Sequence, residues 1–239
     1  MLNAKYKKVL LKLSGQYIAG KKNCGIDFDI LKDLAYETKK VQESGVKVGI
    51  VIGGGNFWRG AFAKEIKRAQ ADYIGMLATV MNSLAMCDIF NSCGLEARVQ
   101  TLIPMPQLAE TYSRAKALSY IKEDKVVIFG GGSGSPYFST DTASVLRAID
   151  IEADVILKAT HTVDGVYDKD PAKHSDAIKY DCLTFKEAHE KHLAVMDETA
   201  MVLCEEHNIP IVVFCGTPLS NISEVICGCK IGTVIKKEC

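Results

Sequence analysis

The sequence has no excess of charge of either sign. Its 239 residues include 29 Lys and Arg and 29 Asp and Glu, so the formal net charge at pH 7 is zero. A protein that binds nucleic acid or a membrane surface through its overall charge carries a basic excess. We therefore expect neither kind of partner, and any bound anion must be held by local groups.

Long apolar runs and an export signal are missing as well. No stretch approaches the roughly 20 apolar residues that a membrane-spanning helix needs. The amino-terminal sequence MLNAKYKKVLLKLSG has Lys12 within its apolar run and no small-residue cleavage site, which argues against a signal peptide. The expected location is the cytoplasm.

The cysteines lack the spacing of zinc and redox motifs. No C-x-x-C pair occurs, and Cys227 and Cys229 are too closely spaced to argue for a zinc site. An odd number of cysteines without an export signal favours reduced, mostly buried thiols. We predict no resident metal site. The nine cysteines are Cys24, Cys87, Cys93, Cys182, Cys204, Cys215, Cys227, Cys229 and Cys239.

Three common nucleotide-binding signatures are also absent. The chain has no G-x-x-x-x-G-K-[ST] P-loop, no G-x-G-x-x-G at the start of a βα unit, and no protein-kinase set of catalytic motifs. These absences exclude the P-loop kinases and the protein kinases. They leave open other folds that bind phosphate through glycine-rich turns.

Short apolar runs rich in β-branched residues recur along the whole chain. They are nearly continuous rather than alternating, which is typical of parallel strands covered on both faces. We predict strands at Val9–Leu13, Val46–Ile52, Ala97–Leu102, Val126–Phe129, Val155–Leu157, Ile211–Phe214 and Thr233–Ile235. We predict helices at Phe28–Glu43, Ala69–Cys93, Tyr112–Lys122, Asp141–Ile151, Phe185–His192, Asp197–His207 and Asn221–Cys227.

The alternation of strands and helices predicts the fold class. It indicates a single α/β domain over residues 1–239, a three-layer α/β/α sandwich with a mainly parallel central sheet. No repeat or low-complexity linker interrupts it. The segment Thr160–Tyr180 lacks periodicity and is rich in Asp, Lys and Gly. We predict that it is a functional loop or lid.

Three glycine- or serine-rich turns each follow a predicted strand. They are Lys12–Gly15, Gly53–Asn56 and Gly130–Ser135. In open α/β sheets ligands bind at the carboxyl ends of the strands, and glycine lets backbone N–H groups approach phosphate oxygens. A single turn of this kind is usually structural, but three of them predict a site for two phosphorylated ligands.

Four charged side chains are candidates for phosphoryl transfer. Lys12 and Lys158 lie at the ends of predicted strands and are expected to neutralise the moving phosphoryl group. Asp141 and Asp197 lie at predicted helix starts, where the alternative to a site role is a helix N-cap. We expect Mg²⁺ to be bound chiefly through nucleotide phosphates.

Seven sequence blocks occur in a fixed order between about residue 9 and about residue 201. They are LLKLSG, VIGGGNFWRG, DYIGMLATVMNSLAM, GSPYFSTDTAS, EADVILKAT, VDGVYDKDPAK and VMDETA. Together they resemble the blocks of the bacterial UMP kinases of the amino acid kinase family, over essentially the whole chain. The block Gly75–Asn82 is the most specific, since simpler amino acid kinases share the first glycine-rich turns but not this block.

The resemblance implies a role for each matching residue. Those matching ATP-binding positions are Lys12, Ser14 and Gly15 for the phosphates, Leu13, Gly55 and Arg59 also on the ATP side, and Thr160, Tyr167 and Asp170 for adenine and ribose. Those matching UMP-binding positions are Gly54, Asp72 for the ribose, Ser133, Gly134, Ser135, Pro136, Tyr137, Phe138, Ser139 and Thr140. Those matching catalytic positions are Lys12, Asp141, Lys158 and Asp197.

The resemblance also implies an activity and partners. The activity is ATP-dependent phosphorylation of UMP to UDP in pyrimidine nucleotide biosynthesis, with Mg²⁺, by in-line transfer. Residues 1–150 form the UMP-binding side and residues 151–239 the ATP-binding side, with a lid at 160–180. UTP is implied as a feedback inhibitor and a homohexamer as the assembly. Related kinases of carboxylates or carbamate, and a non-catalytic nucleotide-binding protein on the same fold, stay as alternatives.

The chain departs from the family pattern at three places. Gln16 stands where Glu is usual, and His161 with Thr162 stand where one residue is common. Cys87 precedes Asp88 where the family's Arg binds the activator GTP, although Arg98 is retained at another position implicated in that effect. GTP activation is therefore an open expectation.

Overall fold

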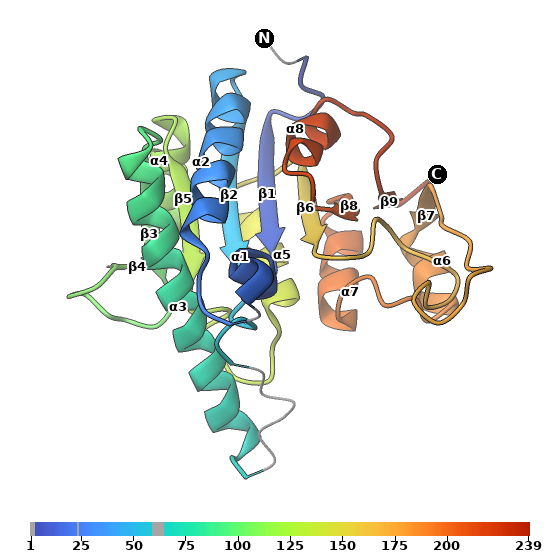
Figure 1. Cartoon of the computed structure of the whole chain (residues 1–239), viewed down its shortest axis with the longest axis horizontal. Coiled ribbons are helices and arrows are strands. Elements are labelled where there is room, and N and C mark those ends of the chain that lie inside the picture. Colours follow the sequence, from blue (N-terminus) through green and yellow to red (C-terminus); the bar gives the residue numbers. More distant parts are fainter. Residues whose placement is uncertain (1–2, 23, 59–64) are drawn as a thin grey trace.

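The computed structural model describes residues 3–22, 24–58 and 65–239 (Figure 1). The strands are β1 (Lys8–Leu13), β2 (Lys47–Ile52), β3 (Ala97–Thr101), β4 (Glu110–Thr111), β5 (Val126–Gly130), β6 (Val155–Thr160), β7 (Cys182–Thr184), β8 (Ile211–Cys215) and β9 (Thr233–Lys236). The helices are α1 (Gly15–Ala19), the 3-10 turn η1 (Gly20–Lys22), α2 (Phe28–Glu43), α3 (Arg68–Ser92), α4 (Arg114–Lys122), α5 (Thr140–Asp150), α6 (Phe185–Glu190), α7 (Glu198–Glu206) and α8 (Ser220–Ile226).

The described strands form one nine-stranded sheet. Its order is β4-β3-β5-β2-β1-β6-β8-β9-β7, and every neighbouring pair is parallel except β8 with β9. The central strand β1 pairs with β2 on one side and β6 on the other, so their carboxyl ends meet at one edge. This is the switch point at which open α/β sheets bind ligands.

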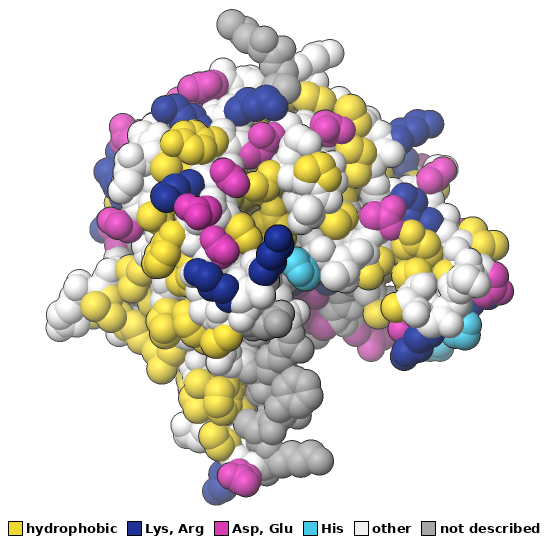
Figure 2. All heavy atoms as spheres, in the orientation of Figure 1, with side chains coloured by type: hydrophobic (Ala, Val, Ile, Leu, Met, Phe, Trp, Pro, Cys, Tyr) yellow, Lys and Arg dark blue, Asp and Glu magenta, His cyan; other side chains and the backbone are white. Residues whose placement is uncertain are grey.

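Helix α3 is the one described helix that is long and apolar enough to span a membrane, by length and composition alone, whereas the sequence predicts no such stretch. It packs against β5, β3 and α2, and its polar Thr79, Asn82 and Ser83 are buried with it. Its opposite side leaves Tyr73, Leu77 and Met81 exposed. Figure 2 shows hydrophobic side chains gathered over this part of the molecule.

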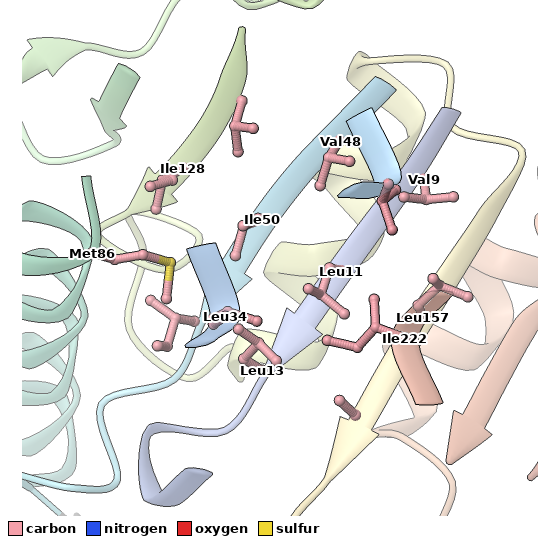
Figure 3. Packing of buried hydrophobic residues seen from close by; sticks show 14 of the residues in the cluster. Val9, Leu11, Leu13, Leu34, Val48, Ile50, Met86, Ile128, Leu157 and Ile222 are labelled. Atoms are coloured by element: carbon pink, nitrogen blue, oxygen red, sulfur yellow. The ribbon is translucent and has the colours of Figure 1, made fainter. Parts of the chain in front are cut away.

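Two hydrophobic cores fill the space between the sheet and its helices. One lies under α2, α3 and α8 and contains Leu11, Leu13 and Ile50 of the sheet (Figure 3). The other lies under α4, α5, α6 and α7 and contains Leu10 and Ile156. Because side chains alternate along a strand, residues of even number in β1 and β6 face α5 and α7.

Capping side chains explain where several helices begin. Asp27 accepts hydrogen bonds from the backbone N–H groups of Asp29 and Ile30 at the start of α2. Thr184 and Glu187 form a capping box at the start of α6. Each such bond satisfies an N–H group that the helix itself leaves unpaired.

The predicted helices and strands are confirmed, apart from small shifts at their ends and four short elements that were not predicted. All seven predicted strands and all seven predicted helices are present, with ends shifted by at most three residues in the strands and two in the helices. The fold class is confirmed as a mainly parallel sheet with helices on both faces. The prediction missed β4, β7, α1 and η1, which span two to five residues and are too short to show a period.

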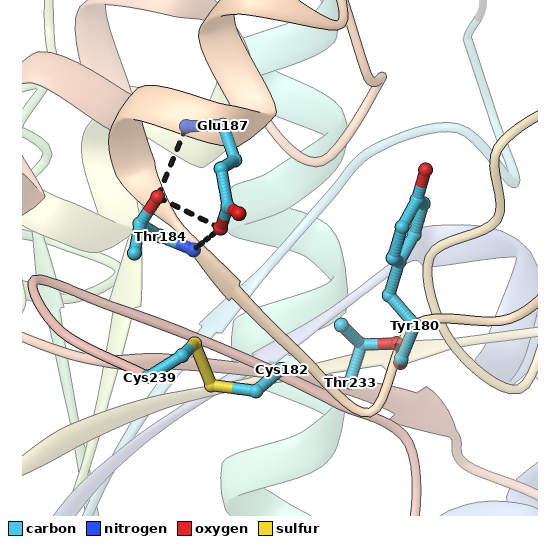
Figure 4. The surroundings of a disulfide bond; sticks show 6 residues. All are labelled: Tyr180, Cys182, Thr184, Glu187, Thr233 and Cys239. Atoms are coloured by element: carbon cyan, nitrogen blue, oxygen red, sulfur yellow. Dashed lines mark hydrogen bonds between the residues drawn. A yellow bond between two sulfur atoms is a disulfide. The ribbon is translucent and has the colours of Figure 1, made fainter.

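The prediction of reduced, mostly buried thiols is wrong for one pair of cysteines, and it is wrong about burial for most of the seven that are free. Cys182 and Cys239 form a disulfide with Cα atoms 5.9 Å apart (Figure 4). Among the other seven cysteines only Cys204 is buried, while Cys24 and Cys229 are exposed. The pairing of β7 with β9 brings the last residue of the sequence beside the first residue of β7, and a separation of 57 residues gives no sign of this in the sequence.

Candidate active site

Two lysines and one aspartate form a compact cluster at the carboxyl ends of β1 and β6. Lys12 and Lys158 are direct partners in the register of these neighbouring strands. Both side chains face α5, where one carboxylate oxygen of Asp141 lies 2.5 Å from Lys12 Nζ and the other 2.8 Å from Lys158 Nζ. The sequence predicted all three residues, and the structure brings them together.

The cluster is mostly shielded from water. The exposed fractions of the side chains are 10% for Lys12, 16% for Asp141 and 17% for Lys158. Burial acts to raise the pKa of Asp141, but the two ammonium groups outweigh it and hold that pKa below its ordinary value. Burial lowers the pKa of Lys158, with Lys12 acting in the same direction and Asp141 opposing. These three residues hold one more cation than anion and can accept a phosphate.

The backbone before α7 orients Lys158. Lys158 Nζ donates a second hydrogen bond to the carbonyl oxygen of Val195 at 2.5 Å. Val195 is buried in the core beneath α6 and α7, so this carbonyl is held in place. The sequence reading missed this group, because any residue type can supply a carbonyl.

Asp197 joins the amino-terminal ends of two helices. It is the N-cap of α7, accepting from Ala200 N at 2.9 Å, as the alternative reading of the sequence had it. It also accepts from the hydroxyls of Thr142 and Ser139 at the start of α5. Asp141, in contrast, is not a cap: Ser139 caps α5 and Asp141 lies in its first turn. Asp197 thereby fixes the helix that carries Asp141.

The first two glycine-rich turns pack against each other. The Gly53 N–H group donates to the Leu13 carbonyl at 2.9 Å. A side chain on Gly15 would place its Cβ 2.6 Å from the Gly53 carbonyl oxygen and 2.8 Å from the Gly55 nitrogen. Glycine is therefore required at position 15 by close approach of backbone, and the two turns form one surface beside Lys12.

A buried pair of asparagines holds the second turn. Asn56 and Asn82 exchange two side-chain amide hydrogen bonds of 2.8 Å, and Asn82 also donates to the Gly53 carbonyl at 2.8 Å. Both are almost completely buried, with exposed fractions of 2% and 0%. Sequence reasoning included both residues in its blocks but gave them no role. Asn82 is a polar residue within the apolar stretch of α3, and that position could have indicated a buried hydrogen-bonding role.

A surface hollow gathers residues predicted to bind UMP. Gly54, Asp72, Phe138 and Thr140 line it. Its other lining residues, which the prediction had not assigned, are Trp58, Ala71, Gly75, Met76, Thr79 and Gly132. Gly54 packs so tightly on α3 that a Cβ there would lie 2.6 Å from the Gly75 carbonyl oxygen. The hollow therefore lies between the second turn, α3 and the third turn.

Asp72 ties α3 to the third glycine-rich segment. Its carboxylate accepts the Tyr137 N–H at 2.8 Å and lies 3.0 Å from Arg68 Nε. Tyr137 has a left-handed backbone with φ of 75° and its side chain is exposed, as is that of Phe138. A carboxylate in this place can accept ribose hydroxyls as well.

The remaining residues of the third turn lie before α5. Ser133 Oγ donates to the Ser135 carbonyl at 2.8 Å and accepts its N–H at 3.2 Å. Gly134 continues this turn, with its N–H bonded to the Gly131 carbonyl, and Pro136 leads into the exposed Tyr137. The segment is thus an ordered rim between the hollow and Asp141.

The residues predicted to bind the adenine and ribose of ATP make hydrogen bonds to other groups of the protein. Thr160 ends β6, and its hydroxyl lies within hydrogen-bond reach of the carbonyls of Val163 and Phe214, to which its single proton can be donated. Tyr167 donates its hydroxyl to Asp164 at 2.6 Å. Asp170 accepts the Ala172 N–H at 3.0 Å within the loop. The structure brings none of these contacts to the lysine cluster, and Arg59 lies outside the described residues.

Leu13 and Ser14 are the remaining residues predicted on the ATP side, and Cys87 is one of the departures from the family pattern. Leu13 is buried in the core, and Ser14 caps α1 by accepting the Tyr17 N–H. Cys87 is half-buried on α3, and its sulfur accepts from Asn91. Across residues 3–22, 24–58 and 65–239, no three His, Cys, Asp or Glu side chains group as metal ligands.

Comparisons with known proteins identify the family. The sequence matches the amino acid kinase family over residues 7–215. Uridylate kinase of Limosilactobacillus reuteri strain DSM 20016 is 52% identical over 240 residues, covering 100% of both chains. The crystal structure of UMP kinase from Bacillus anthracis has a TM-score of 0.94 at 38% identity, covering 98% of this chain and 97% of that one. The structure of UMP kinase from Ureaplasma parvum has a TM-score of 0.92 at 36% identity, covering 98% and 100%. The chain therefore belongs to the amino acid kinase family and, within it, to the uridylate kinases.

Proposed function

We propose that the chain transfers the γ-phosphoryl group of ATP to UMP, giving ADP and UDP. The observation that carries the proposal is the cluster of Lys12, Asp141 and Lys158 beside two glycine-rich turns and next to the hollow at Asp72. Phosphoryl transfer needs positioned cations and little covalent chemistry. This cluster supplies two ammonium groups that the phosphates can pair with.

The acceptor and donor nucleotides occupy different sides of the cluster. We assign UMP to the side built from residues 1–150, where the hollow has Asp72 for the ribose and Thr140 near the base and phosphate. We assign ATP to the side built from residues 151–239, under the loop after β6, with the phosphates over Ser14, Gly15 and Gly55. In-line transfer then takes place between them, and Mg²⁺ enters with ATP to neutralise its phosphates.

The first experiment is a coupled ADP-release assay with MgATP and UMP, CMP, dTMP or AMP, with and without GTP. Turnover confined to UMP is the expected result. Formation of an acyl phosphate from a carboxylate or carbamate without UMP turnover would favour the related amino acid kinases instead. Tight UMP or UTP binding without turnover would identify a binding protein, although the intact charged cluster speaks against that.

Replacing Asp72 by asparagine should raise the KM for UMP about tenfold and leave the KM for ATP nearly unchanged. An amide offers one acceptor oxygen where the carboxylate offers two, and it lacks the charge that strengthens hydrogen bonds from hydroxyls. Steady-state kinetics with each nucleotide varied measures the difference. Asp88→Asn, an exposed position on the same helix, is the control. An equal loss for both nucleotides would contradict a ribose role for Asp72.

Replacing Asn82 by alanine should lower the free energy of unfolding by about 2–3 kcal/mol, because the Asn56 amide and the Gly53 carbonyl then lack buried partners. We also expect higher KM values, since the turn that faces phosphate loses its anchor. Urea unfolding and kinetics measure the two effects. Asp88→Ala, an exposed position on α3, controls for a general effect of substitution on this helix. Wild-type KM values in a destabilised Asn82→Ala protein would show that the turn needs no such anchor.

Assembly, regulation and location follow the same proposal. The exposed Tyr73, Leu77 and Met81 lie one helical turn apart on α3, which supports a face that pairs with a second copy, within a homohexamer. A monomeric mass in solution would contradict it.

We propose UTP as a feedback inhibitor and the cytoplasm as the location. Cys87 itself offers no positive charge to GTP, whereas Arg98 is retained, so activation by GTP stays open and the assay with and without GTP decides it.

A further inference from the structure

We propose that Cys182 and Cys239 are a reversible dithiol–disulfide site that controls how firmly the loop between β6 and β7 is anchored. The part that concerns ATP rests on the proposed function of that loop. In a reducing compartment a disulfide is usually transient and redox-sensing rather than structural. The place of this disulfide in the fold shows what it would control.

The disulfide joins the edge of the sheet to the end of the sequence. Cys182 is the first residue of β7, a strand of three residues at the edge of the sheet. Cys239 lies three residues beyond β9, and 57 residues separate the two cysteines in the sequence. Cys182 is half-buried and Cys239 is exposed, so reductants and oxidants can reach the bond.

The start of β9, close to this disulfide, also holds both ends of the loop between β6 and β7: the outgoing limb at Val166 and the returning limb at Tyr180. Thr233, at the start of β9, accepts the Val166 N–H at 2.8 Å and donates its hydroxyl to the Tyr180 carbonyl at 2.5 Å. The next residue, Val234, donates to the Asp181 carbonyl at 3.0 Å. Figure 4 shows Thr233 of β9 beside Tyr180, which lies on the segment that leads into Cys182. The outgoing and returning limbs therefore share one attachment to β9.

An edge strand of three residues is weakly held, because it pairs on one side and contributes few backbone bonds. The disulfide adds a covalent link at the first residue of this strand, directly after the shared attachment. Oxidation should therefore reduce fraying of β7 and of the returning limb. A loop that is already ordered requires less ordering when ATP binds, so the oxidised protein should bind ATP more tightly.

The surroundings favour these two cysteines over the buried Cys204. Burial raises the pKa of the Cys204 thiol to about 12, so that thiol does not react. Cys182 lines a surface hollow whose charged residues are Lys5, Lys230, Lys236 and Asp181. The three cations outnumber the one carboxylate, so the hollow attracts an anionic small disulfide such as oxidised glutathione. Cys229 lines the same hollow and is the competing partner that the test must separate.

The chemistry is two successive thiol–disulfide exchanges. The thiolate of one cysteine attacks a sulfur of the small disulfide RSSR, forming a mixed disulfide and releasing RS⁻. The second thiolate attacks the protein sulfur of that mixed disulfide and releases another RS⁻. The protein loses two electrons and two protons, and RSSR becomes two RSH. A thiol such as dithiothreitol reverses both steps.

The test uses the full chain after incubation with oxidised glutathione or with dithiothreitol. Non-reducing peptide mapping by mass spectrometry should show a peptide linking Cys182 and Cys239 only in the oxidised protein. The KM for ATP should be lower in the oxidised protein by on the order of threefold to tenfold, with the KM for UMP unchanged. Cys239→Ser should keep the higher KM for ATP after either treatment, oxidised glutathione or dithiothreitol. Cys229→Ser should respond as the wild type does.

Hydrogen exchange separates this inference from the proposed activity. Amides of residues 163–181 should exchange more slowly in the oxidised protein, whether or not the protein turns over UMP. A link between Cys182 and Cys229, or no link at all, would overturn the proposal. So would equal exchange and equal ATP affinity in the two states. An inactive protein that shows the link and the protection would overturn only the proposed kinase function.

Discussion

Replacement of Lys12 by alanine is expected to lower kcat about a thousandfold, with smaller changes in KM. Lys12 is held at the carboxyl end of the central strand, with only 10% of its side chain exposed. A preorganised cation in a shielded site stabilises transition-state charge more than it would in water, because no solvent must reorganise. Its loss should therefore affect turnover more than binding.

The strand itself offers the control for this variant. Lys8 lies at the opposite end of β1, where its Nζ is 3.5 Å from Glu152 at the surface. A surface ion pair of this kind contributes about 0–1 kcal/mol. Lys8→Ala should therefore leave kcat unchanged, whereas single-turnover measurements on Lys12→Ala should show a slow chemical step. Turnover of Lys12→Ala within tenfold of the wild type would remove Lys12 from the site.

The sequence predicted the fold well because the sheet is covered on both faces. Strands such as Lys8–Leu13 and Val155–Thr160 each contain a run of three apolar residues and are apolar at four of six positions. Such a run between helical segments is typical of a strand covered on both faces. The short strands β4 and β7 depend on their neighbours for existence rather than on their own residues. Their place at the two edges of the sheet explains why the sequence alone did not show them.

The sequence predicted the charged residues of the site but not what holds them. Lys12 and Lys158 follow apolar runs, so the ends of parallel strands predicted that they meet. The Val195 carbonyl has no signature in the sequence, because every residue carries one. The contact of Asp197 with Thr142 depends on the packing of α5 on α7, which only the assembled fold specifies.

The second large effect is expected for Asp141→Asn, which should destabilise the free protein and nearly abolish turnover. Removing the shared carboxylate leaves two ammonium groups facing each other in a mostly buried place. Breaking a buried ion pair from one side costs about 3 kcal/mol or more. For a chain of this length, that corresponds to a fall in Tm of roughly 6–12 °C. We expect kcat to fall by at least about a hundredfold, because the lysines lose their common orientation.

Comparing the loss of stability of Asp141→Asn with and without ATP is the more decisive measurement. In the free protein Asp141 is the counterion of two lysines that phosphates are expected to contact. Nucleotide phosphates should supply the missing negative charge, so ATP should raise the Tm of Asp141→Asn more than that of the wild type. Asp150→Asn is the matched control, because Asp150 ends the same helix and pairs with Arg147 at 2.8 Å, away from the cluster. Its loss of stability should be the same with and without ATP.

These outcomes distinguish a structural ion pair from a phosphate site. If Asp141 only stabilised the fold, ATP would raise the Tm of both variants equally, and Asp141→Asn would keep its turnover at temperatures where it is folded. If phosphates replace the carboxylate as partners of Lys12 and Lys158, the variant should bind ATP at least as tightly as the wild type while turning over slowly. Tight binding with slow turnover is expected, since the lysines would then pair with the ground-state phosphates but lack the carboxylate that directs them to the transferring group.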